Sequence, residues 1–313
     1  NIDYNEDKLF KNDSYDISIM SYVDPQVINY SGSGRVSADS STFKVADLLA
    51  LDDIYASQGF GTSNAFTGNT TYGFNTTITS STSSIWNQFT TFIGSTSYTI
   101  ADGAGIDTID LSRFSNSQIL DLRASNANLT TPYYSSIEGR ANNLSIAVGT
   151  VIENAVGGLV ADTITGNSAD NSIQGLAGND TITSGAGNDS IDGGTGDDSL
   201  MGGTGDDTLD GSTGDDTLIG NEGADQFRLS AGSDVITDFT SGTDKVIIDP
   251  GLNYILEDEG LNMKIKSSNG NSLTLNNISK ADFNEANDIS LFGAPTPTPE
   301  PSPTPTPEPS PTP

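Results

Sequence analysis

The sequence contains no cysteine and no histidine. Without cysteine, no disulfide can cross-link the fold, so a chain that works outside the cell needs another means of stabilisation. Without histidine, a Ser-His-Asp triad, a Cys-His pair and a histidine-based metal site are excluded within this chain. No apolar run approaches the roughly 20 residues that a membrane-spanning helix requires. These absences exclude a disulfide framework, the common histidine-dependent catalytic centres and a helical membrane span.

Basic residues are also scarce. The 12 Lys and Arg against 42 Asp and Glu give 313 residues a formal net charge of −30. We therefore expect no binding to nucleic acid or to anionic membrane surfaces. Segment 157–237 alone holds 14 Asp and 1 Glu against 1 Arg, a net charge of −14. Such a density repels itself unless cations neutralise it, so cation binding and folding should be coupled.

Nine consecutive nonapeptides fill this acidic segment, from Gly157 to Thr237, in one register. The clearest read GGTGDDSLM, GGTGDDTLD and GSTGDDTLI, over 193–219. Position six is Asp in every unit except at Asn171, and position eight is always apolar. This is the Gly-Gly-x-Gly-x-Asp-x-U-x pattern, with U apolar, of a calcium-binding parallel β-roll. A disordered Gly/Asp-rich linker, the alternative, does not explain an apolar residue at every ninth position.

The residue types explain the pattern. Glycine permits a tight turn that aims carbonyl oxygens inward, and the Asp adds a carboxylate. Ca²⁺ takes about six to eight such oxygen ligands and could stabilise the fold in place of disulfides. The next three residues should form a short strand whose apolar member faces the core. Two nonapeptides make one coil, so each ion should lie between a turn and its equivalent two units later, with ligands from positions two, four and six.

The candidate calcium ligands of the roll are glycines of the turn and the Asp that closes it. They are Gly158, Asp162, Gly175, Gly178, Asp180, Gly185, Gly187, Asp189, Gly194, Gly196, Asp198, Gly203, Gly205, Asp207, Gly214, Asp216, Gly223 and Asp225. The strongest sites are expected at Asp180, Asp189, Asp198, Asp207 and Asp216. The first units depart most, because Val160 and Ala169 stand where Gly is usual and Asn171 should give a weaker site.

Five segments are expected along the chain. They are an α+β segment 1–62, a β-sandwich lead-in 63–156, the roll 157–237, capping strands 238–293 and a Pro-rich linker 294–313. The first should hold a helix at 44–57. Short strands are expected at 98–100, 106–111, 119–122, 144–148, 234–249, 263–265 and 273–275. The linker has Pro at every second position and should be extended polyproline II. A spacer without a partner and a connection to a further domain are both open.

Five motifs occur in a familiar order: DISIMSY (16–22), LLALDDIYASQGFG (48–61), TGNTTYGFN (67–75), DGAGIDTIDLS (102–112) and LSIAVGTVIENAVGG (144–158). Their ordered series resembles the serralysin family of secreted zinc metalloproteases, with only the Pro-rich tail outside the likeness. The resemblance implies a mainly β fold. It consists of a right-handed parallel β-roll with flanking β-sandwich strands, preceded by the C-terminal remnant of an α+β metalloprotease domain.

The resemblance also assigns roles near the start of the chain. Tyr22 matches the Met-turn tyrosine, a zinc ligand or oxyanion stabiliser, and Met20 matches the apolar floor beneath the metal. An ordinary core Met and buried Tyr are the alternative. In the family, three histidines of a His-Glu-x-x-His-x-x-Gly-x-x-His stretch hold zinc, and its Glu is the general base. That stretch is absent and would lie upstream of Asn1, so we expect a fragment or processed product that cleaves nothing alone.

Calcium sites outside the repeats are implied as well. The matching positions are Phe66, Gly68, Thr70, Asp102, Ala104, Gly105, Asp107, Val151 and Glu153. Phe66 and Val151 can offer only a carbonyl oxygen, and Ala104 replaces a Gly of the family pattern. Capping of a turn is the alternative role for Asp102 and Asp107.

Two functions are compatible with these features. In the first, the chain is the calcium-binding region of a secreted serralysin-like zinc metalloendopeptidase, and the roll is a calcium-dependent folding and export module. Its partners would be calcium ions, a protein or peptide substrate of the parent and a type I secretion machinery. Residues 280–292 resemble the family's export signal. In the second, the chain is a non-catalytic extracellular calcium-binding surface or adhesion protein.

Overall fold

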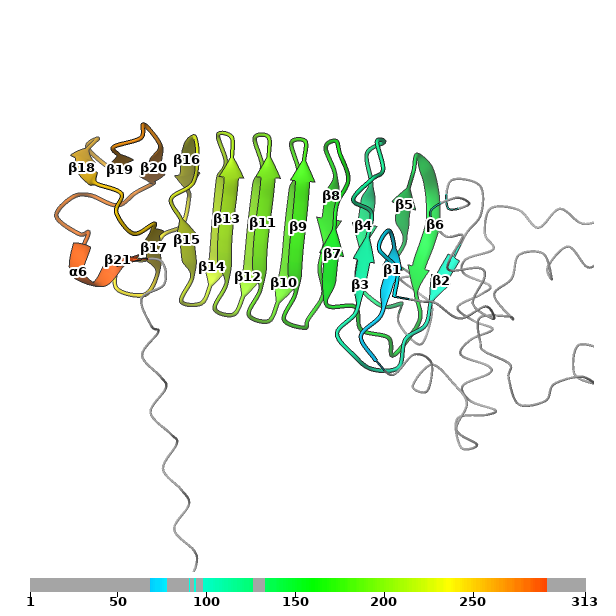
Figure 1. The fold of residues 1–313 in the computed structure, drawn as a ribbon. Helices are drawn as coiled ribbons and strands as arrows, with labels where there is room; N and C mark the ends of the chain where they lie inside the picture. Colours follow the sequence, from blue (N-terminus) through cyan, green and yellow to red (C-terminus); the bar gives the residue numbers. More distant parts are fainter. Residues whose placement is uncertain (1–67, 78–89, 91–92, 94–97, 126–132, 292–313) are drawn as a thin grey trace, which may run out of the picture.

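The computed structural model describes residues 68–77, 90, 93, 98–125 and 133–291. Over these ranges the chain forms two long, mainly parallel sheets along one axis (Figure 1). The nine-stranded sheet has the order β1-β3-β7-β9-β11-β13-β15-β17-β21. The twelve-stranded sheet has the order β18-β19-β20-β16-β14-β12-β10-β8-β4-β5-β6-β2. Successive nonapeptides therefore contribute strands to the two sheets in turn.

The strands of the repeat segment each stack on the strand two units away. They are β8 (Thr163–Thr165), β9 (Ser172–Ala177), β10 (Thr181–Ala186), β11 (Ser190–Thr195), β12 (Ser199–Thr204), β13 (Thr208–Thr213), β14 (Thr217–Glu222), β15 (Gln226–Arg228) and β16 (Ser233–Ile236). Ile182 pairs with Leu200, for example. The predicted three-residue strand was too short, since β9 to β14 have six residues each. The reason is that the parallel ladder continues into positions two and three of the next unit, where Gly194 and Thr195 pair with Leu176 and Ala177.

Position eight of every unit lies in the core. The nine side chains are at most 1% exposed: Ile164, Ile173, Ile182, Ile191, Leu200, Leu209, Leu218, Phe227 and Ile236. They alternate between the two sheets and form one apolar cluster. Burying each contributes about 1.5–3 kcal/mol of hydrophobic free energy. The apolar periodicity of the sequence therefore produces the roll directly.

The lead-in continues both sheets. Strands β1 (Thr71–Gly73), β3 (Thr108–Asp110) and β7 (Asn154–Val156) extend the nine-stranded sheet. Strands β2 (Tyr98–Ile100), β4 (Ile119–Asp121), β5 (Ser135–Ile137) and β6 (Arg140–Ile146) extend the other. The buried Tyr72, Leu120 and Leu144 belong to the same apolar cluster as the roll residues. The lead-in thus extends the apolar core of the roll beyond its first coil.

The opposite end is closed by the strands after the repeats. These are β17 (Lys245–Ile248), β18 (Tyr254–Asp258), β19 (Met263–Ser267), β20 (Ser272–Leu275) and β21 (Ile289–Leu291), with the short helix α6 (Glu285–Asp288). Strands β18, β19 and β20 are antiparallel, whereas β17 and β21 stay parallel to the roll. No helix in the described part of the chain is long and apolar enough to cross a membrane.

The β part of the predicted fold class is confirmed: a parallel β-roll with flanking strands in two facing sheets. The expected helix at 44–57, Met20, Tyr22, Phe66 and the Pro-rich tail lie outside the described residues. The division into five segments stays a prediction.

Candidate calcium sites

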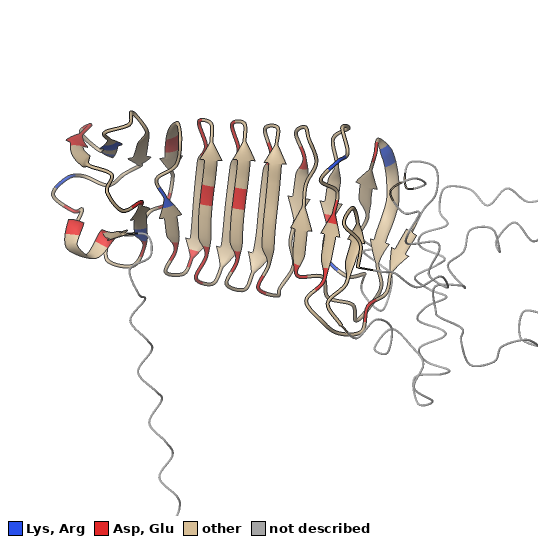
Figure 2. Ribbon diagram, in the orientation of Figure 1, with Lys and Arg blue, Asp and Glu red and all other residues tan. Residues whose placement is uncertain are grey.

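The Asp of position six lies inside its turn and is held by a backbone donor. The N–H of Asp180 donates to Asp198 Oδ1 at 2.7 Å, and the N–H of Asp189 donates to Asp207 Oδ1 at 2.8 Å. The same bond recurs at every second unit and forms two carboxylate ladders. The first runs through Asp162, Asp180, Asp198, Asp216 and Asp234, and the second through Asn171, Asp189, Asp207, Asp225 and Asp244. Acidic residues accordingly appear at the turns between the strands (Figure 2).

Six carboxylates of the two ladders keep one oxygen without a donor. The Oδ2 atoms of Asp180, Asp189, Asp198, Asp207, Asp216 and Asp225 are buried, and no hydrogen-bond partner for them lies among the described residues. These side chains are at most 3% exposed. A buried, ionised oxygen without a partner is costly, so the arrangement requires either a cation or a proton there.

Glycine at position one makes room for this carboxylate. A Cβ added to Gly193, Gly202 or Gly211 would lie 2.3, 2.2 or 2.1 Å from the Oδ2 atom of the Asp in the same turn. Gly175 has this role too, with a distance of 2.4 Å to Asp180 Oδ2. Gly175 was predicted from the sequence as a calcium ligand, and its role in making room for the carboxylate was not predicted. The signal for this role was the regular occurrence of Gly at position one of the repeat.

Carbonyl oxygens of positions two and four face the stacked turn two units later. A Cβ on Gly203 would lie 2.0 Å from the carbonyl oxygen of Gly185, and one on Gly196 would lie 2.0 Å from that of Gly178. Gly196 also has a φ of 128°, which side chains rarely adopt. Carbonyl oxygens of positions two and four therefore lie in the narrow space between stacked turns.

This donor set suits calcium and does not suit zinc. Among the described residues there is no group of three or more His, Cys, Asp or Glu side chains that could hold a metal. The oxygens of the roll come instead from backbone carbonyls and one carboxylate per turn, which hard cations such as Ca²⁺ accept. Zinc prefers Cys sulfur and His nitrogen, and the sequence contains neither residue.

The pKa values of the ladder carboxyls reflect their burial. Burial raises the pKa of Asp180, Asp198 and Asp225 to about 6, and that of Asp207 and Asp216 to about 7. Neighbouring carboxylates raise these pKa values further, while the ladder N–H donors lower them only in part. The ionised turns therefore need positive charge, which a divalent cation would supply.

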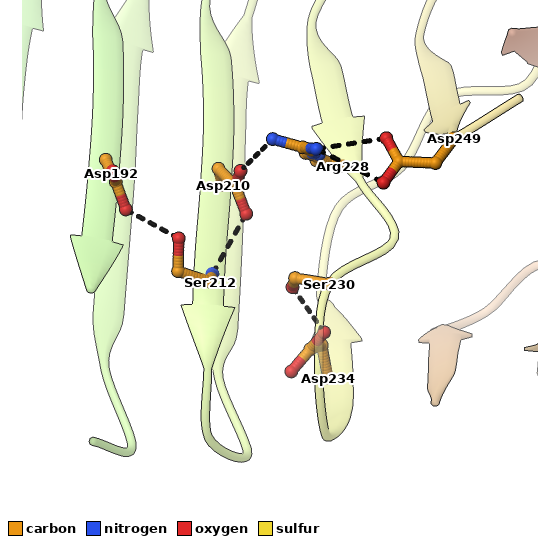
Figure 3. A network of polar contacts seen from close by, with 7 residues as sticks. All are labelled: Asp192, Asp210, Ser212, Arg228, Ser230, Asp234 and Asp249. Carbon is orange, nitrogen blue, oxygen red and sulfur yellow. Dashed lines mark hydrogen bonds and ion pairs between the residues drawn. The ribbon is translucent and has the colours of Figure 1, made fainter. Parts of the chain in front are cut away.

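The residues at the ends of the ladders differ from the middle ones. Gly158 N–H donates to Asp162 Oδ2 at 2.5 Å, and Asn167 N–H donates to Asn171 Oδ1 at 2.9 Å. The Ser230 hydroxyl donates to Asp234 Oδ2 at 2.8 Å (Figure 3). Protein donors thus occupy oxygens that stay free in the middle turns. Gly158 and Asp162 are the usual repeat residues, and only Val160 in place of Gly marked their unit as different in the sequence.

A second cluster forms in the lead-in from three distant segments. Thr70 N–H donates to Asp107 Oδ1 at 2.7 Å, and Asp107 N–H donates to Glu153 Oε2 at 2.7 Å. The Thr70 hydroxyl donates to the Gly68 carbonyl oxygen at 2.9 Å. A Cβ on Gly105 would lie 2.7 Å from that same oxygen. These five residues, expected from the resemblance to act together, are adjacent in the structure.

Asp102 belongs to this cluster and has a partner that the sequence did not reveal. The Tyr72 hydroxyl donates to Asp102 Oδ2 at 2.6 Å, whereas Asp102 Oδ1 is buried without a partner among the described residues. Burial raises the pKa of Asp102, and the Tyr72 hydroxyl and the Ala104 N–H lower it. Burial, with the charges of Asp102 and Glu153, raises the pKa of Asp107 to about 7. Val151 is 48% exposed.

Two curated relatives share about half of this chain. The metallopeptidase AprA of Pseudomonas marginalis is 34% identical over 165 residues, which cover 50% of this chain and 30% of that protein. Serralysin B of Dickeya chrysanthemi is 34% identical over 157 residues, covering 50% of this chain and 29% of that protein. The matched part of the chain thus spans less than a third of these curated relatives.

Among solved structures, the AlgE6R2 subunit of the Azotobacter vinelandii mannuronan C5-epimerase is 26% identical, with a TM-score of 0.29. The match covers 45% of this chain and 94% of that subunit. A family model described as peptidase M10 serralysin C terminal matches residues 62–257, more than half of the sequence. The resemblance found in the motifs is confirmed, and the chain belongs to the peptidase M10 serralysin C-terminal family.

Proposed function

We propose that the roll of this chain binds calcium and folds in response to it. The single observation that carries the proposal is the row of six buried Asp carboxylates in successive units, each with one oxygen that lacks a partner among the described residues. Ca²⁺ accepts about six to eight oxygens in flexible geometry, whereas Mg²⁺ demands a near-ideal octahedron and keeps several waters. Stacked turns rich in carbonyl oxygens therefore favour calcium.

Calcium binding and folding are coupled in this proposal by charge. The repeat segment has a net charge of −14, and its middle carboxylates are packed inside the turns. Without a cation, folding would bring these charges together and remove them from water. Binding to the folded state alone stabilises it by mass action, so calcium shifts the chain towards the roll.

The roll would serve as a calcium-dependent folding and export module of a secreted protein. Calcium sites of extracellular modules have dissociation constants of about 10⁻⁴–10⁻³ M. Such sites stay empty at cytosolic calcium and fill outside the cell. The segment would pass a type I secretion machinery unfolded and fold after export. Membership of the serralysin C-terminal family supports this extracellular location.

The longer protein to which this region belongs is proposed to be a zinc metalloendopeptidase that acts on proteins or peptides. The support is the identity to AprA and the serralysins. Tyr22 and Met20 would then complete its Met-turn, in the first of the five proposed segments. The chain itself has no histidine and should cleave nothing alone. Casein hydrolysis by the longer protein, abolished by a zinc chelator, is the expected result. Absence of hydrolysis would favour a calcium-binding surface or adhesion protein.

The lead-in cluster is proposed as a further calcium site. Gly68, Asp102, Gly105, Asp107 and Glu153 would supply carboxylate and carbonyl oxygens around the free Asp102 Oδ1. Thr70 holds the arrangement through its bonds to Gly68 and Asp107. Ala104 and Val151 could contribute only backbone carbonyls.

Equilibrium calcium binding to two neighbouring variants tests the proposal. Asp198→Asn replaces a buried ladder carboxylate with a free oxygen, whereas Asp197→Asn removes the same charge from an exposed side chain of the same turn. We expect Asp198→Asn to bind fewer ions and Asp197→Asn to bind as many as the unaltered chain. Equal loss from both variants, or no calcium binding by the unaltered chain, would refute the proposal.

A further inference from the structure

The two carboxylate ladders have the same plan from end to end. The first has free Oδ2 atoms at Asp180, Asp198 and Asp216, between Asp162 and Asp234. The second has them at Asp189, Asp207 and Asp225, between Asn171 and Asp244. Each ladder therefore contains three residues with a free oxygen. The residue at either end of the ladder has the equivalent side-chain atom in a hydrogen bond with another protein group.

The occupied ends use four different protein donors. Asp162 receives the N–H groups of Gly158 and Gln118, at 2.5 and 2.6 Å. Asp234 receives the Ser230 hydroxyl at 2.8 Å and the Asp216 N–H at 3.1 Å. In both cases the two carboxylate oxygens each accept a hydrogen bond. Each of these oxygens therefore already has a protein donor, unlike the Oδ2 atoms of the middle turns.

The second ladder closes in a related way. Thr240 N–H and Asp225 N–H donate to the two oxygens of Asp244, at 2.7 and 3.0 Å. Asn171 accepts from Asn167 N–H through Oδ1 and donates its amide to the Glu153 carbonyl oxygen at 3.0 Å. At this end the Asn171 side-chain amide donates a hydrogen bond to the Glu153 carbonyl oxygen, so this oxygen needs no cation.

The backbone at position two changes at the same boundaries. The six middle units have positive φ there, between 67° and 122°: Leu176, Gly185, Gly194, Gly203, Ser212 and Asn221. Gly158, Asn167 and Ser230 hold position two in the outer units and do not have positive φ. The middle conformation leaves the carboxylate oxygen free, and Leu176 adopts it despite its side chain. In the first two units φ at position two is not positive, and the backbone N–H of this residue donates to the side-chain oxygen of position six.

The lead-in holds the first two turns in their closed form. Leu159 N–H donates to the Phe114 carbonyl oxygen at 2.9 Å, next to Gly158. The Asn167 side chain donates to the carbonyl oxygen of Ile152 at 2.7 Å. These bonds come from a different segment, so the conformation of the first two turns depends on the lead-in.

We propose that calcium fills only the six middle turns, within 175–228, and that the flanking turns are metal-free caps in which protein donors take the place of the cation. This inference depends on the calcium binding proposed above and adds its limits. It removes Asp162 and Asn171 from the calcium ligands, although the repeat pattern includes their units. The caps would end each row of ions with turns whose side-chain oxygens are hydrogen-bonded within the protein.

Three variants along the first ladder test the limits. Asp198→Asn alters a middle turn, whereas Asp162→Asn and Asp234→Asn alter its two ends with the same change of charge and almost the same shape. The full 313-residue chain and each variant are dialysed to calcium concentrations of up to ~10 mM, above the range of extracellular sites. Bound calcium per chain is then measured by atomic emission, and far-UV circular dichroism verifies the β-structure.

We expect Asp198→Asn to bind fewer ions than the unaltered chain and Asp234→Asn to bind the same number. Asp162→Asn should lose thermal stability, because Gly158 N–H loses its acceptor, yet keep the number of ions. A loss of ions from Asp234→Asn, or from a folded Asp162→Asn, would overturn the metal-free caps. Unchanged calcium binding by Asp198→Asn would overturn the assignment of calcium to the middle turns. An unaltered chain that binds no calcium would instead refute the calcium proposal itself.

Discussion

At the scale of single residues, the roll depends on how one carboxylate per turn is satisfied. Each middle Asp uses Oδ1 to bind the stacked backbone and keeps Oδ2 free. Burial raises the pKa of these carboxyls. A proton or a cation can therefore stabilise the same turn, and the two compete for one oxygen.

This competition predicts a pH dependence for the calcium-free chain. The folded pKa values of Asp207 and Asp216, about 7, lie above the ordinary value of 3.8 that applies when unfolded. The folded state binds more protons, so this stability is complete below pH 3.8 and is lost as the pH rises to about 7. With a chelator present, far-UV circular dichroism should show more β-structure at about pH 4 than at about pH 7.5.

Two controls separate this effect from general repulsion. Adding ~0.5 M NaCl screens exposed charges but should not restore the β-signal at high pH, because buried charges are screened little. Saturating calcium should remove the pH dependence above about pH 6, since it binds the ionised carboxylates. A calcium-free chain whose β-signal increases with pH would contradict the proton dependence expected from the buried carboxyls.

At the scale of turns and strands, stability comes from close stacking of equivalent backbones. Position four of each middle turn approaches the backbone of the turn two units before it, and only glycine fits there. The position-eight side chains fill the space between the two sheets. The turns and strands therefore share one repeat, and a substitution that disrupts one turn should also destabilise the turns stacked on it.

Gly196→Ala tests the close approach between turns. Its new Cβ would lie 2.0 Å from the Gly178 carbonyl oxygen, in addition to the strain of a φ of 128°. Gly270→Ala is the control, because Gly270 also has positive φ, 100°, but nothing within 4 Å of the new Cβ. Strain alone should cost about 1–2 kcal/mol. We expect a clearly larger loss from Gly196→Ala in thermal unfolding with calcium, and equal losses would contradict this stacking.

Arg228 of β15 joins Asp210 of β13 to Asp249, the residue that follows β17. Its guanidinium donates to Asp210 at 2.9 Å and to Asp249 at 3.0 Å, as Figure 3 shows. The Arg228 side chain is 35% exposed, so water and salt weaken these pairs. Arg228→Gln should cost only about 0.5 kcal/mol in thermal unfolding, and less at high salt.

Calcium binding is the discriminating measurement for Arg228→Gln. Because this network lies outside the carboxylate ladders, the number of bound ions should not change. A loss of calcium binding would mean that this network and the turns are coupled.

At the scale of the whole molecule, the repeat register predicted more than any single motif. The stacking of each unit on the second one along the chain and the burial of every position-eight side chain followed from the sequence. The role of Gly175 in making room for the carboxylate and the partnership of Tyr72 with Asp102 did not, because each depends on which atoms meet in three dimensions. The closed turn at Gly158 was equally hidden, since Phe114 and Gln118 from the lead-in fix its surroundings.

Hydrogen exchange of residues 175–228, with and without calcium, tests whether the roll folds in response to the ion. We expect rapid exchange in a chelator, because the ionised middle turns lack a counter-charge. We expect strong protection of the same residues once calcium reaches ~1 mM, the range of extracellular sites. Equal protection in the two conditions would contradict a roll that folds in response to calcium.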